Sequence, residues 1–225
     1  MQRKFRSPRS DDSRGVASPF LDRISDFTVR RLSSYCRILR NLETNSASTV
    51  SSAKLAELCG VTSAQVRKDL SYFGNFGTRG LGYQVSELKT AIEKIMGLHR
   101  QWSVALFGAG SLGHALFFHE GFREDGFYFR HVFEVDPLKV GKKWQDVEIR
   151  PIEEAESRLK RIPVDIAVVA TPSESAQEIV DLVVGLGVKA IMNFAPRKLN
   201  VPDNVGLRNV NLAVALESLS FFLSN

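Results

Sequence analysis

The chain has 225 residues and a formal net charge of +5; 44% of its residues are hydrophobic and 24% are charged, which is typical of a globular protein with a substantial core. No apolar run approaches the ~18 residues of a membrane span, and the charged start, MQRKFRSPRSDDSRG, lacks the hydrophobic segment of a secretory signal. Two cysteines, Cys36 and Cys59, exclude a disulfide framework and fit a reducing cytoplasm, and the four histidines show no metal-ligand spacing.

The basic charge is concentrated near the N-terminus. Residues 1–100 carry 17 Lys and Arg against 9 Asp and Glu, whereas residues 101–225 carry 13 against 16. A basic half is typical of a protein that binds a polyanion, although a solvated basic surface explains the charge equally well. Residues 1–22 are rich in Arg, Ser, Asp and Pro and have no apolar period, so we expect a disordered basic tail.

After a long amphipathic helix from Phe27, a helix-turn-helix is predicted. Ser51 and Ser52 offer N-caps for a short helix, and Gly60 ends it in the left-handed conformation. Thr62-Ser-Ala-Gln65 matches a capping box, in which Gln65 would reach back to the start of a second helix. A plain helical hairpin is the alternative interpretation of this segment.

The glycine-rich segment that follows favours a DNA-binding function. Four glycines in GNFGTRGLGYQ, residues 74–84, predict a tight hairpin, and a hairpin directly after a helix-turn-helix is a wing. The second helix would enter the major groove, while the wing tip would reach the minor groove unless it is an ordinary exposed turn. The candidate DNA contacts are Gln65, Arg67, Lys68, Ser71, Tyr72 and Arg79.

Beyond a linker helix at 85–98, strands and helices alternate. Apolar strands are predicted at 104–108, 131–135, 166–170 and 188–194, with helices at 111–120 and 174–186. This alternation predicts a parallel sheet covered on both faces. The last segment, 212–223, is apolar on several sides, so a helix there must be buried in its own chain or in a partner.

The first of these strands leads into Gly108-Ala-Gly110-Ser-Leu-Gly113, a G-x-G-x-x-G motif in the strand-to-helix context that dinucleotide binding requires. The acidic residue expected about 20 positions on is Glu134 or Asp136, and we favour Glu134, which would select NAD over NADP. The loops at 170–173 and 193–196, which follow the third and fourth predicted strands, are suited to lining a nicotinamide pocket. The candidate cofactor-binding residues are Gly108, Ala109, Gly110, Ser111, Leu112, Gly113, Glu134, Thr171, Pro172, Asn193 and Phe194.

None of the four histidines falls at the carboxyl end of a later strand, where a catalytic base would be expected. A cofactor domain without catalytic residues, joined to a DNA-binding domain, indicates a sensor rather than an enzyme. An NAD-dependent oxidoreductase is the alternative from another class.

Long motifs of this chain resemble the Rex family of redox-sensing transcriptional repressors. They are VTSAQVRKDLSYFGNFGTRGLGYQV (61–85), VALFGAGSLGHAL (104–116), FEVDPLKVG (133–141), MNFAP (192–196) and RNVNLAVALESLSFFL (208–223). The resemblance implies a homodimer in which each subunit has a winged helix-turn-helix domain, a Rossmann domain that binds NADH or NAD⁺, and a C-terminal helix swapped into its partner. It also implies that NADH releases the protein from a palindromic DNA operator.

Two positions depart from the family pattern. The resemblance places His119 where the family has a tyrosine, and Asn211 where it has an aspartate that exchanges partners between that tyrosine and an arginine of the first helix, here Arg37. The charged switch is therefore absent, and a paralogue that binds DNA with lost or altered NADH sensing is a further alternative.

The predicted fold class is α/β: an N-terminal winged helix-turn-helix domain (23–98), a Rossmann-type doubly wound parallel sheet (99–210) and a C-terminal domain-swapped helix (211–225). The expected function is a cytoplasmic, dimeric DNA-binding repressor that senses NAD(H), without catalytic or metal-ligating residues.

Overall fold

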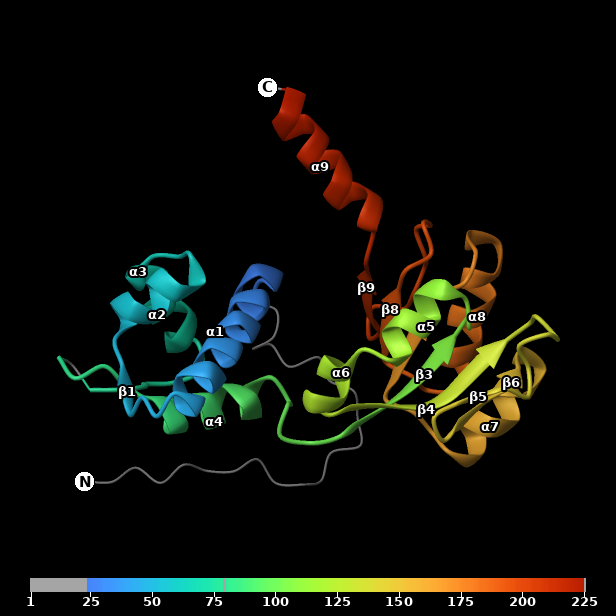
Figure 1. Ribbon diagram of the computed structural model, residues 1–225, viewed down its shortest axis with the longest axis horizontal. Coiled ribbons are helices and arrows are strands. Elements are labelled where there is room, and N and C mark those ends of the chain that lie inside the picture. The colour runs from blue at the N-terminus through green and yellow to red at the C-terminus, as the bar shows by residue number, and fades with distance from the viewer. Residues whose placement is uncertain (1–23, 79, 225) are drawn as a thin grey trace.

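The computed structural model describes residues 24–78 and 80–224. The predicted basic tail at 1–22 and the wing-tip residue Arg79 lie outside the described residues. Figure 1 shows a helical N-terminal body, a body built on a sheet, and a C-terminal helix that projects from the second body.

Short elements around a small apolar core build the N-terminal body. They are α1 (Asp26–Thr44), β1 (Thr49–Val50), α2 (Ser52–Cys59), α3 (Ser63–Ser71), β2 (Tyr83–Gln84) and α4 (Val85–Ile95). Each helix contributes an apolar face to one cluster, which includes Leu32, Leu39, Leu55, Val66 and Leu88. After α3 the chain passes through the glycine-rich hairpin to β2, which pairs antiparallel with β1, and then enters α4.

The predicted ends of α2 and α3 are confirmed. The hydroxyl of Ser51 accepts a hydrogen bond from the Lys54 amide at 3.0 Å, and that of Thr62 accepts from the Gln65 amide at 3.1 Å. Gly60 ends α2 with φ 67°, in the left-handed region. The second half of the capping box is wrong, because the Gln65 side chain instead donates to Asp69, one turn further along α3.

The second body is a seven-stranded sheet in the order β5-β6-β4-β3-β7-β8-β9, parallel except for the β5–β6 pair. Its strands are β3 (Trp102–Phe107), β4 (Phe127–Glu134), β5 (Lys143–Trp144), β6 (Val147–Pro151), β7 (Ile166–Val169), β8 (Ala190–Asn193) and β9 (Gly206–Asn209). The chain runs outward from β3 in one direction and later in the other. This reversal places a topological switch point between β3 and β7, where such sheets bind ligands.

Side chains of the sheet alternate between its two faces, and each face contributes to a separate hydrophobic core. One face packs against α7 (Ala155–Arg161) and α8 (Ser173–Gly185), through residues such as Phe107, Leu159 and Val180. The other packs against α5 (Ser111–Phe117). No described helix lies between β8 and β9, so this second face is only partly covered near β7 and β8.

The alternating pattern predicted the strands of the inner sheet but missed shorter elements. The helix expected at 111–120 ends at Phe117, and the separate α6 (Glu120–Glu124) begins after His119. The two-residue β5, the neighbouring β6, the 3-10 helix η2 (Ile152–Glu154), α7 and the edge strand β9 were not predicted. Short edge elements carry too few residues for a clear period.

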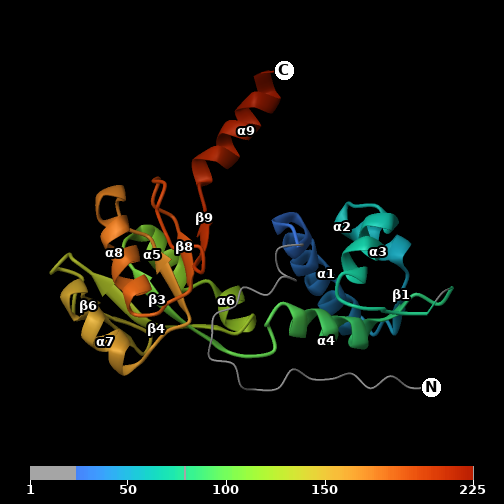
Figure 2. The same ribbon diagram turned by 180° about the vertical axis from the view of Figure 1, so that it is seen from behind.

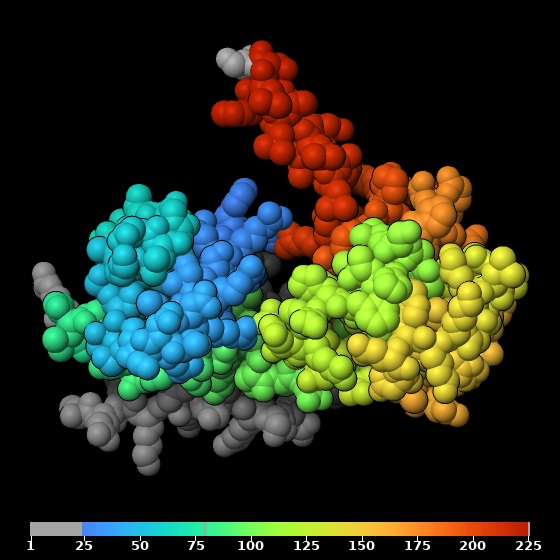
Figure 3. Space-filling model, in the orientation of Figure 1, coloured from blue at the N-terminus to red at the C-terminus, as the bar shows by residue number. Residues whose placement is uncertain are grey.

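The C-terminal helix α9 (Leu212–Ser224) leaves the sheet body after β9, as the view from behind also shows (Figure 2). All its described residues are exposed, and Phe222 is 76% exposed. In the space-filling view, α9 stands clear of both bodies (Figure 3). An apolar helix of this kind needs a partner surface.

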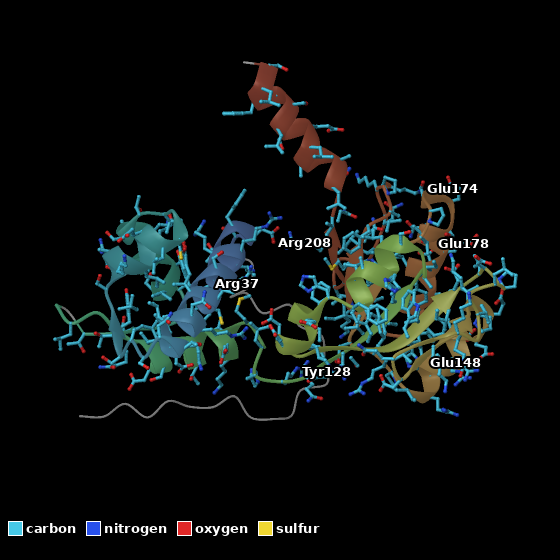
Figure 4. All side chains as sticks on the ribbon, viewed as in Figure 1. Arg37, Tyr128, Glu148, Glu174, Glu178 and Arg208 are labelled. Carbon is cyan, nitrogen blue, oxygen red and sulfur yellow. The ribbon has the colours of Figure 1, made fainter. Side chains whose placement is uncertain are left out.

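Ion pairs join α1 to the sheet body at both ends of the helix. Near its C-terminal end, Arg40 pairs with Glu93 of α4 and with Asp125, just after α6. At its N-terminal end, Asp26 pairs with Arg208 of β9. Arg37 and Arg208 lie where the two bodies face each other (Figure 4). Helix α1 therefore contacts the sheet body at two places, one just after α6 and one close to the start of α9.

Candidate functional site

Helix α3 presents an exposed polar stripe. Gln65, Lys68 and Tyr72 are spaced by three and four residues, so they lie on one side of the helix. Lys68 is exposed and Tyr72 is 36% exposed, while Val66 and Leu70 anchor the opposite side in the core. A stripe of an amide, a cation and a phenol is suited to base edges and phosphates.

The other candidate DNA contacts are placed differently. Arg67 leaves the stripe and donates to the Ser52 hydroxyl at 3.0 Å, which ties it to the start of α2. The hydroxyl of Ser71 donates to the Lys68 carbonyl at 2.7 Å and is exposed. The hairpin that would form the wing is closed by a bridge between Thr78 and Gly82.

A buried carboxylate lies directly behind the stripe. Asp69 of α3 is fully buried, and it forms an ion pair with Arg31 of α1 at 2.6 Å. The Tyr35 hydroxyl and the Gln65 amide also donate to it. Burial alone would raise the pKa of Asp69, but the hydrogen bonds from these three side chains outweigh it and hold the pKa below its usual range.

The sheet body contains a cavity of about 520 Å³ at the switch point. Five of the predicted cofactor residues line it: Gly108, Gly110, Glu134, Thr171 and Pro172. Its apolar wall comes from Val135, Ile152, Ile179 and Leu182. A second cavity of about 430 Å³ adjoins it across Gly110 and Lys139, and Ala109 and Ser111 line that one. The glycine loop therefore lies between two hollows at the carboxyl ends of the strands.

The three glycines of the loop differ in what surrounds them. A Cβ at Gly113 would lie 2.0 Å from the Gly108 carbonyl oxygen, and one at Gly108 would lie 2.5 Å from the Ala170 carbonyl oxygen. These two glycines permit the close packing of loop, helix and neighbouring strand. A Cβ at Gly110 would meet nothing within 4 Å, so this position opens onto the cavities.

Glu134, at the end of β4, is buried at the edge of the cavity. Its carboxylate accepts hydrogen bonds from the backbone amides of Ala109, Val135 and Asp136, and Lys139 lies 3.4 Å away. Burial would raise its pKa, but these amides and the lysine outweigh burial and keep the pKa below its usual range. The carboxylate is therefore an anion that the glycine loop itself helps to hold.

Thr171 provides a polar group without a partner. Its hydroxyl oxygen is shielded from solvent and makes no hydrogen bond within the described chain, although the residue lines the cavity. A ligand with hydroxyl or phosphate oxygens would satisfy it. The open Gly110, the anionic Glu134 and this unpaired hydroxyl together fit an adenine dinucleotide.

Four predicted cofactor residues line neither of the two cavities. Gly113 packs behind the loop, and Leu112 is half-buried in α5. Asn193 is fully buried, and its amide bonds to the Ala195 and Arg197 carbonyls and to Asn209, so its side chain shapes its own turn. Phe194 packs against the core on the α5 side of the sheet.

The three switch candidates are not in contact within one chain. Arg37 is exposed on α1, the His119 ring lies 4.8 Å from the Phe122 ring at the start of α6, and the Asn211 side chain accepts from the Ala213 amide. Among the described residues, no hydrogen bond or ion pair joins any two of them.

Sequence reasoning missed several residues that shape these sites. Asp69 was not singled out, because a charged residue inside a helix-turn-helix is typically exposed, and no pattern in the sequence links Arg31 or Tyr35 of α1 to it. Ile179 and Leu182 form part of the cavity wall, and only the apolar face of the predicted helix at 174–186 hinted at them. Lys139 reaches Glu134 from the loop after β4.

Comparison with known proteins agrees with both halves of the structure. A family model described as "Putative DNA-binding protein N-terminus" matches residues 23–71, and one described as "CoA binding domain" matches residues 99–197. A protein of Carboxydothermus hydrogenoformans, named redox-sensing transcriptional repressor Rex, is 50% identical over 88% of this chain and 96% of that protein. A protein of the same name from Desulfitobacterium hafniense is 49% identical over 88% of this chain and 95% of that protein.

Solved structures agree over the same span. A structure titled as RSP in complex with β-NAD⁺ and operator DNA has a TM-score of 0.85 and 40% identity, over 89% of this chain and 92% of that one. The structure of RSP with β-NADH has a TM-score of 0.81 and 38% identity, over 89% and 94% of the two chains. RSP is described there as a Rex-family repressor.

Proposed function

Because this chain belongs to the Rex family of redox-sensing transcriptional repressors, we propose that it represses transcription from a DNA operator and responds to NADH and NAD⁺. One observation carries the proposal: an exposed recognition stripe on α3 and a dinucleotide-type cavity at a sheet switch point occur in the same chain. The complexes of RSP with NADH, and with NAD⁺ and operator DNA, support both ligands.

The direct test is operator binding titrated with each cofactor separately. The probe is the duplex that the wild-type protein recovers from a randomised library, with binding followed by fluorescence anisotropy. We expect NAD⁺ to preserve or strengthen binding and NADH to weaken it. No recovered duplex, or equal effects of the two cofactors, would contradict the proposal.

For the cofactor, the residues that would bind NAD(H) are Gly108, Gly110, Glu134, Thr171 and Pro172, with Ala109 and Ser111 beside them. Glu134 would face the adenosine ribose, and the open side of Gly110 would leave room for the pyrophosphate. The match to a CoA-binding model agrees, because CoA also has an adenosine joined to a pyrophosphate. Bound NAD(H) supplies the redox-sensitive group, and the chain supplies its position.

Regulation, rather than catalysis, fits the cavity and the relatives. None of the described histidines lines the cavity of about 520 Å³, although His114 lines the adjoining one. The relatives named above are repressors. Cytoplasmic localisation follows from the proposed operator DNA. No helix within the described residues is long and apolar enough to cross a membrane.

For the operator, we assign direct contact to Gln65, Lys68 and Tyr72 on the α3 stripe. Ser71 and Arg67 would lie at its margins, and contact of Arg79 with DNA stays a prediction from the sequence. Two recognition helices related by a two-fold axis would read a palindrome, so the operator and the oligomer share this symmetry.

Lys68→Ala should weaken operator binding and lower the slope of log affinity against log salt concentration by about 1, because one phosphate contact is lost. Anisotropy titrations at several salt concentrations measure both effects. Lys160→Ala is the matched control, since Lys160 is an exposed lysine on α7 of the sheet body. Wild-type affinity and slope in Lys68→Ala would remove this residue from the interface.

A homodimer would bury two surfaces that the single chain leaves open. Besides α9, the sheet face near β7 and β8 has an apolar hollow of about 120 Å³. Leu116, Phe122, Ile166, Val168 and Met192 are among the residues that line it, and every residue of its lining is apolar. We assign this face to the partner subunit, whose α9 supplies a matching apolar surface.

The ion pairs of α1 would couple the sheet body, which contains the cofactor cavity, to the DNA-binding stripe on α3. The start of α9 follows Arg208 closely, and Arg208 pairs with Asp26 at the beginning of α1, the helix whose Arg31 and Tyr35 bind Asp69 of α3. A ligand shifts operator binding only by its differential affinity for two arrangements of these bodies. A change at the dimer interface would therefore reach α3 through α1.

The NADH response of the wild-type protein should be incomplete, and Asn211→Asp combined with His119→Tyr should sharpen it by about fivefold in the NADH/NAD⁺ ratio at half release. Asn211 has no charge, so the cost of an unpaired buried carboxylate cannot arise. Operator release is measured against NADH at saturating NAD⁺, with each single variant as a control. Full release of the wild type at low NADH, with no gain in the double variant, would show that these positions do not limit the switch.

A further inference from the structure

We propose that Asp69 is a positioning residue for base recognition: it holds the side-chain amide of Gln65 in the one orientation that reads adenine. The proposal rests on the proposed DNA-binding function and adds a specificity determinant to it. Asp69 itself would not touch DNA, because its side chain is fully buried.

The hydrogen bonds around Asp69 leave no acceptor site unused. One carboxylate oxygen, Oδ2, accepts from Arg31 Nε at 2.6 Å and from the Tyr35 hydroxyl at 2.9 Å. The other, Oδ1, accepts from Arg31 Nη2 at 2.8 Å and from Gln65 Nε2 at 2.7 Å. Two donors per oxygen satisfy an ionised carboxylate in full. Arg31 of α1 donates to both oxygens, so it fixes the carboxylate relative to the core without the Tyr35 hydroxyl.

This arrangement decides which end of the Gln65 amide faces inward. An ionised carboxylate only accepts hydrogen bonds, so the nitrogen of Gln65 must lie against Asp69 and the carbonyl oxygen must point away from it. One N–H of Gln65 is used, which leaves one N–H and the carbonyl oxygen. In the major groove, adenine presents N7 as an acceptor and its N6 amino group as a donor. The free N–H of Gln65 can donate to N7, and its carbonyl oxygen can accept from N6.

The position of Gln65 on α3 allows its side-chain amide to contact a base edge. Gln65 lies near the N-terminal end of α3, the part of a recognition helix that contacts base edges. It lies one turn before Asp69 on the same side of the helix, and it shares the exposed stripe with Lys68 and Tyr72. A glutamine held in one rotamer before binding loses less conformational freedom on contact with DNA.

The ion pair behind Gln65 also fits a positioning role. Buried ion pairs are often replaceable by apolar residues without loss of stability, so stability alone gives a weak reason for a charged group here. The bidentate guanidinium of Arg31 fixes the plane of the carboxylate. A fixed plane directs the remaining lone pair of Oδ1 toward Gln65.

Three variants and one double variant test the proposal on the duplex recovered by the wild-type protein, with single base-pair substitutions across one half-site. Gln65→Ala should reduce discrimination at one A·T position by about fivefold or more. Asp69→Asn should reduce it at the same position, and the double variant should be no worse than either. Tyr35→Phe is the matched control, because it removes another hydrogen bond to Asp69 without touching Gln65; it should lower thermal stability and keep the base preference.

Unchanged discrimination in Asp69→Asn, or an equal loss in Tyr35→Phe, would overturn the positioning role while leaving DNA binding intact. Failure of the wild type to select any duplex would instead overturn the proposed function and this role with it. A second measurement does not depend on the folding of Asp69→Asn. In the DNA-free wild type, NMR relaxation should find the Gln65 side-chain amide more ordered than that of the exposed Gln84. Equal mobility of the two amides would also overturn the proposal.

Discussion

We expect Gly110→Val to weaken the binding of NADH and NAD⁺ at least 100-fold, which is about 2.7 kcal/mol of binding free energy. A side chain at this position has no neighbouring atom within 4 Å, so the loop accommodates it without strain. The two added methyl groups then occupy the space between the cavities where the pyrophosphate would lie. Isothermal titration calorimetry measures the loss, and operator binding of the variant should no longer respond to the cofactor ratio.

A substitution at Gly110 separates the loss of cofactor binding from a loss of folding. Gly113→Val would clash with the Gly108 carbonyl and disturb the fold, whereas Gly110→Val should keep the wild-type melting temperature. Gly185→Val is the matched control, because a Cβ there also meets nothing within 4 Å, at the end of α8. If calorimetry finds unchanged binding in Gly110→Val, the glycine loop has only a structural role.

If the proposed homodimer forms through α9, we expect truncation after Asn211 to give a monomer with poor operator affinity. The large apolar side chains of α9 are exposed in the single chain; among them are Leu216, Leu219, Phe221 and Phe222. Burying these four in a partner stabilises the dimer by about 6 to 12 kcal/mol per helix, an upper limit based on side-chain transfer. Without this term, two recognition helices are no longer held at a fixed spacing.

Light scattering measures the mass of the truncated chain, and anisotropy measures its operator affinity. This truncation keeps Arg208 with its Asp26 partner and Asn209 with Asn193, so the sheet edge stays intact. Ser220→Ala is the control, because it changes α9 without removing apolar area. A full-length protein that is already monomeric at micromolar concentration would contradict the assignment of α9.

Local signals on the chain predicted much of the fold. Thr62 and Gly60 marked helix ends because capping depends on one side chain or one backbone conformation, which can be read at a single position. The G-x-G-x-x-G motif located the cavity for a similar reason, since each glycine has its own packing or ligand requirement. Short edge elements such as β5 and β9 have no comparable local signal.

Long-range partners could not be predicted in the same way. Gln65 matched a capping box in the sequence, but Asp69 competes for its amide, and Asp69 is fixed by Arg31 and Tyr35 from another helix. Asn193 is the last residue of β8, a position typical of a ligand-binding residue, yet its amide is used by its own turn and by Asn209. These outcomes depend on tertiary neighbours that the spacing of residues does not specify.

The partly covered sheet face near β7 and β8 and the exposed α9 would make the stability of the proposed dimer depend on protein concentration. If each subunit completes the core of the other, the folded state gains free energy only as subunits associate, and the melting temperature rises with total protein concentration. At low total concentration fewer chains are paired, so a larger fraction would be present as the less stable single chain. The amount of folded repressor would then depend on assembly as well as on synthesis.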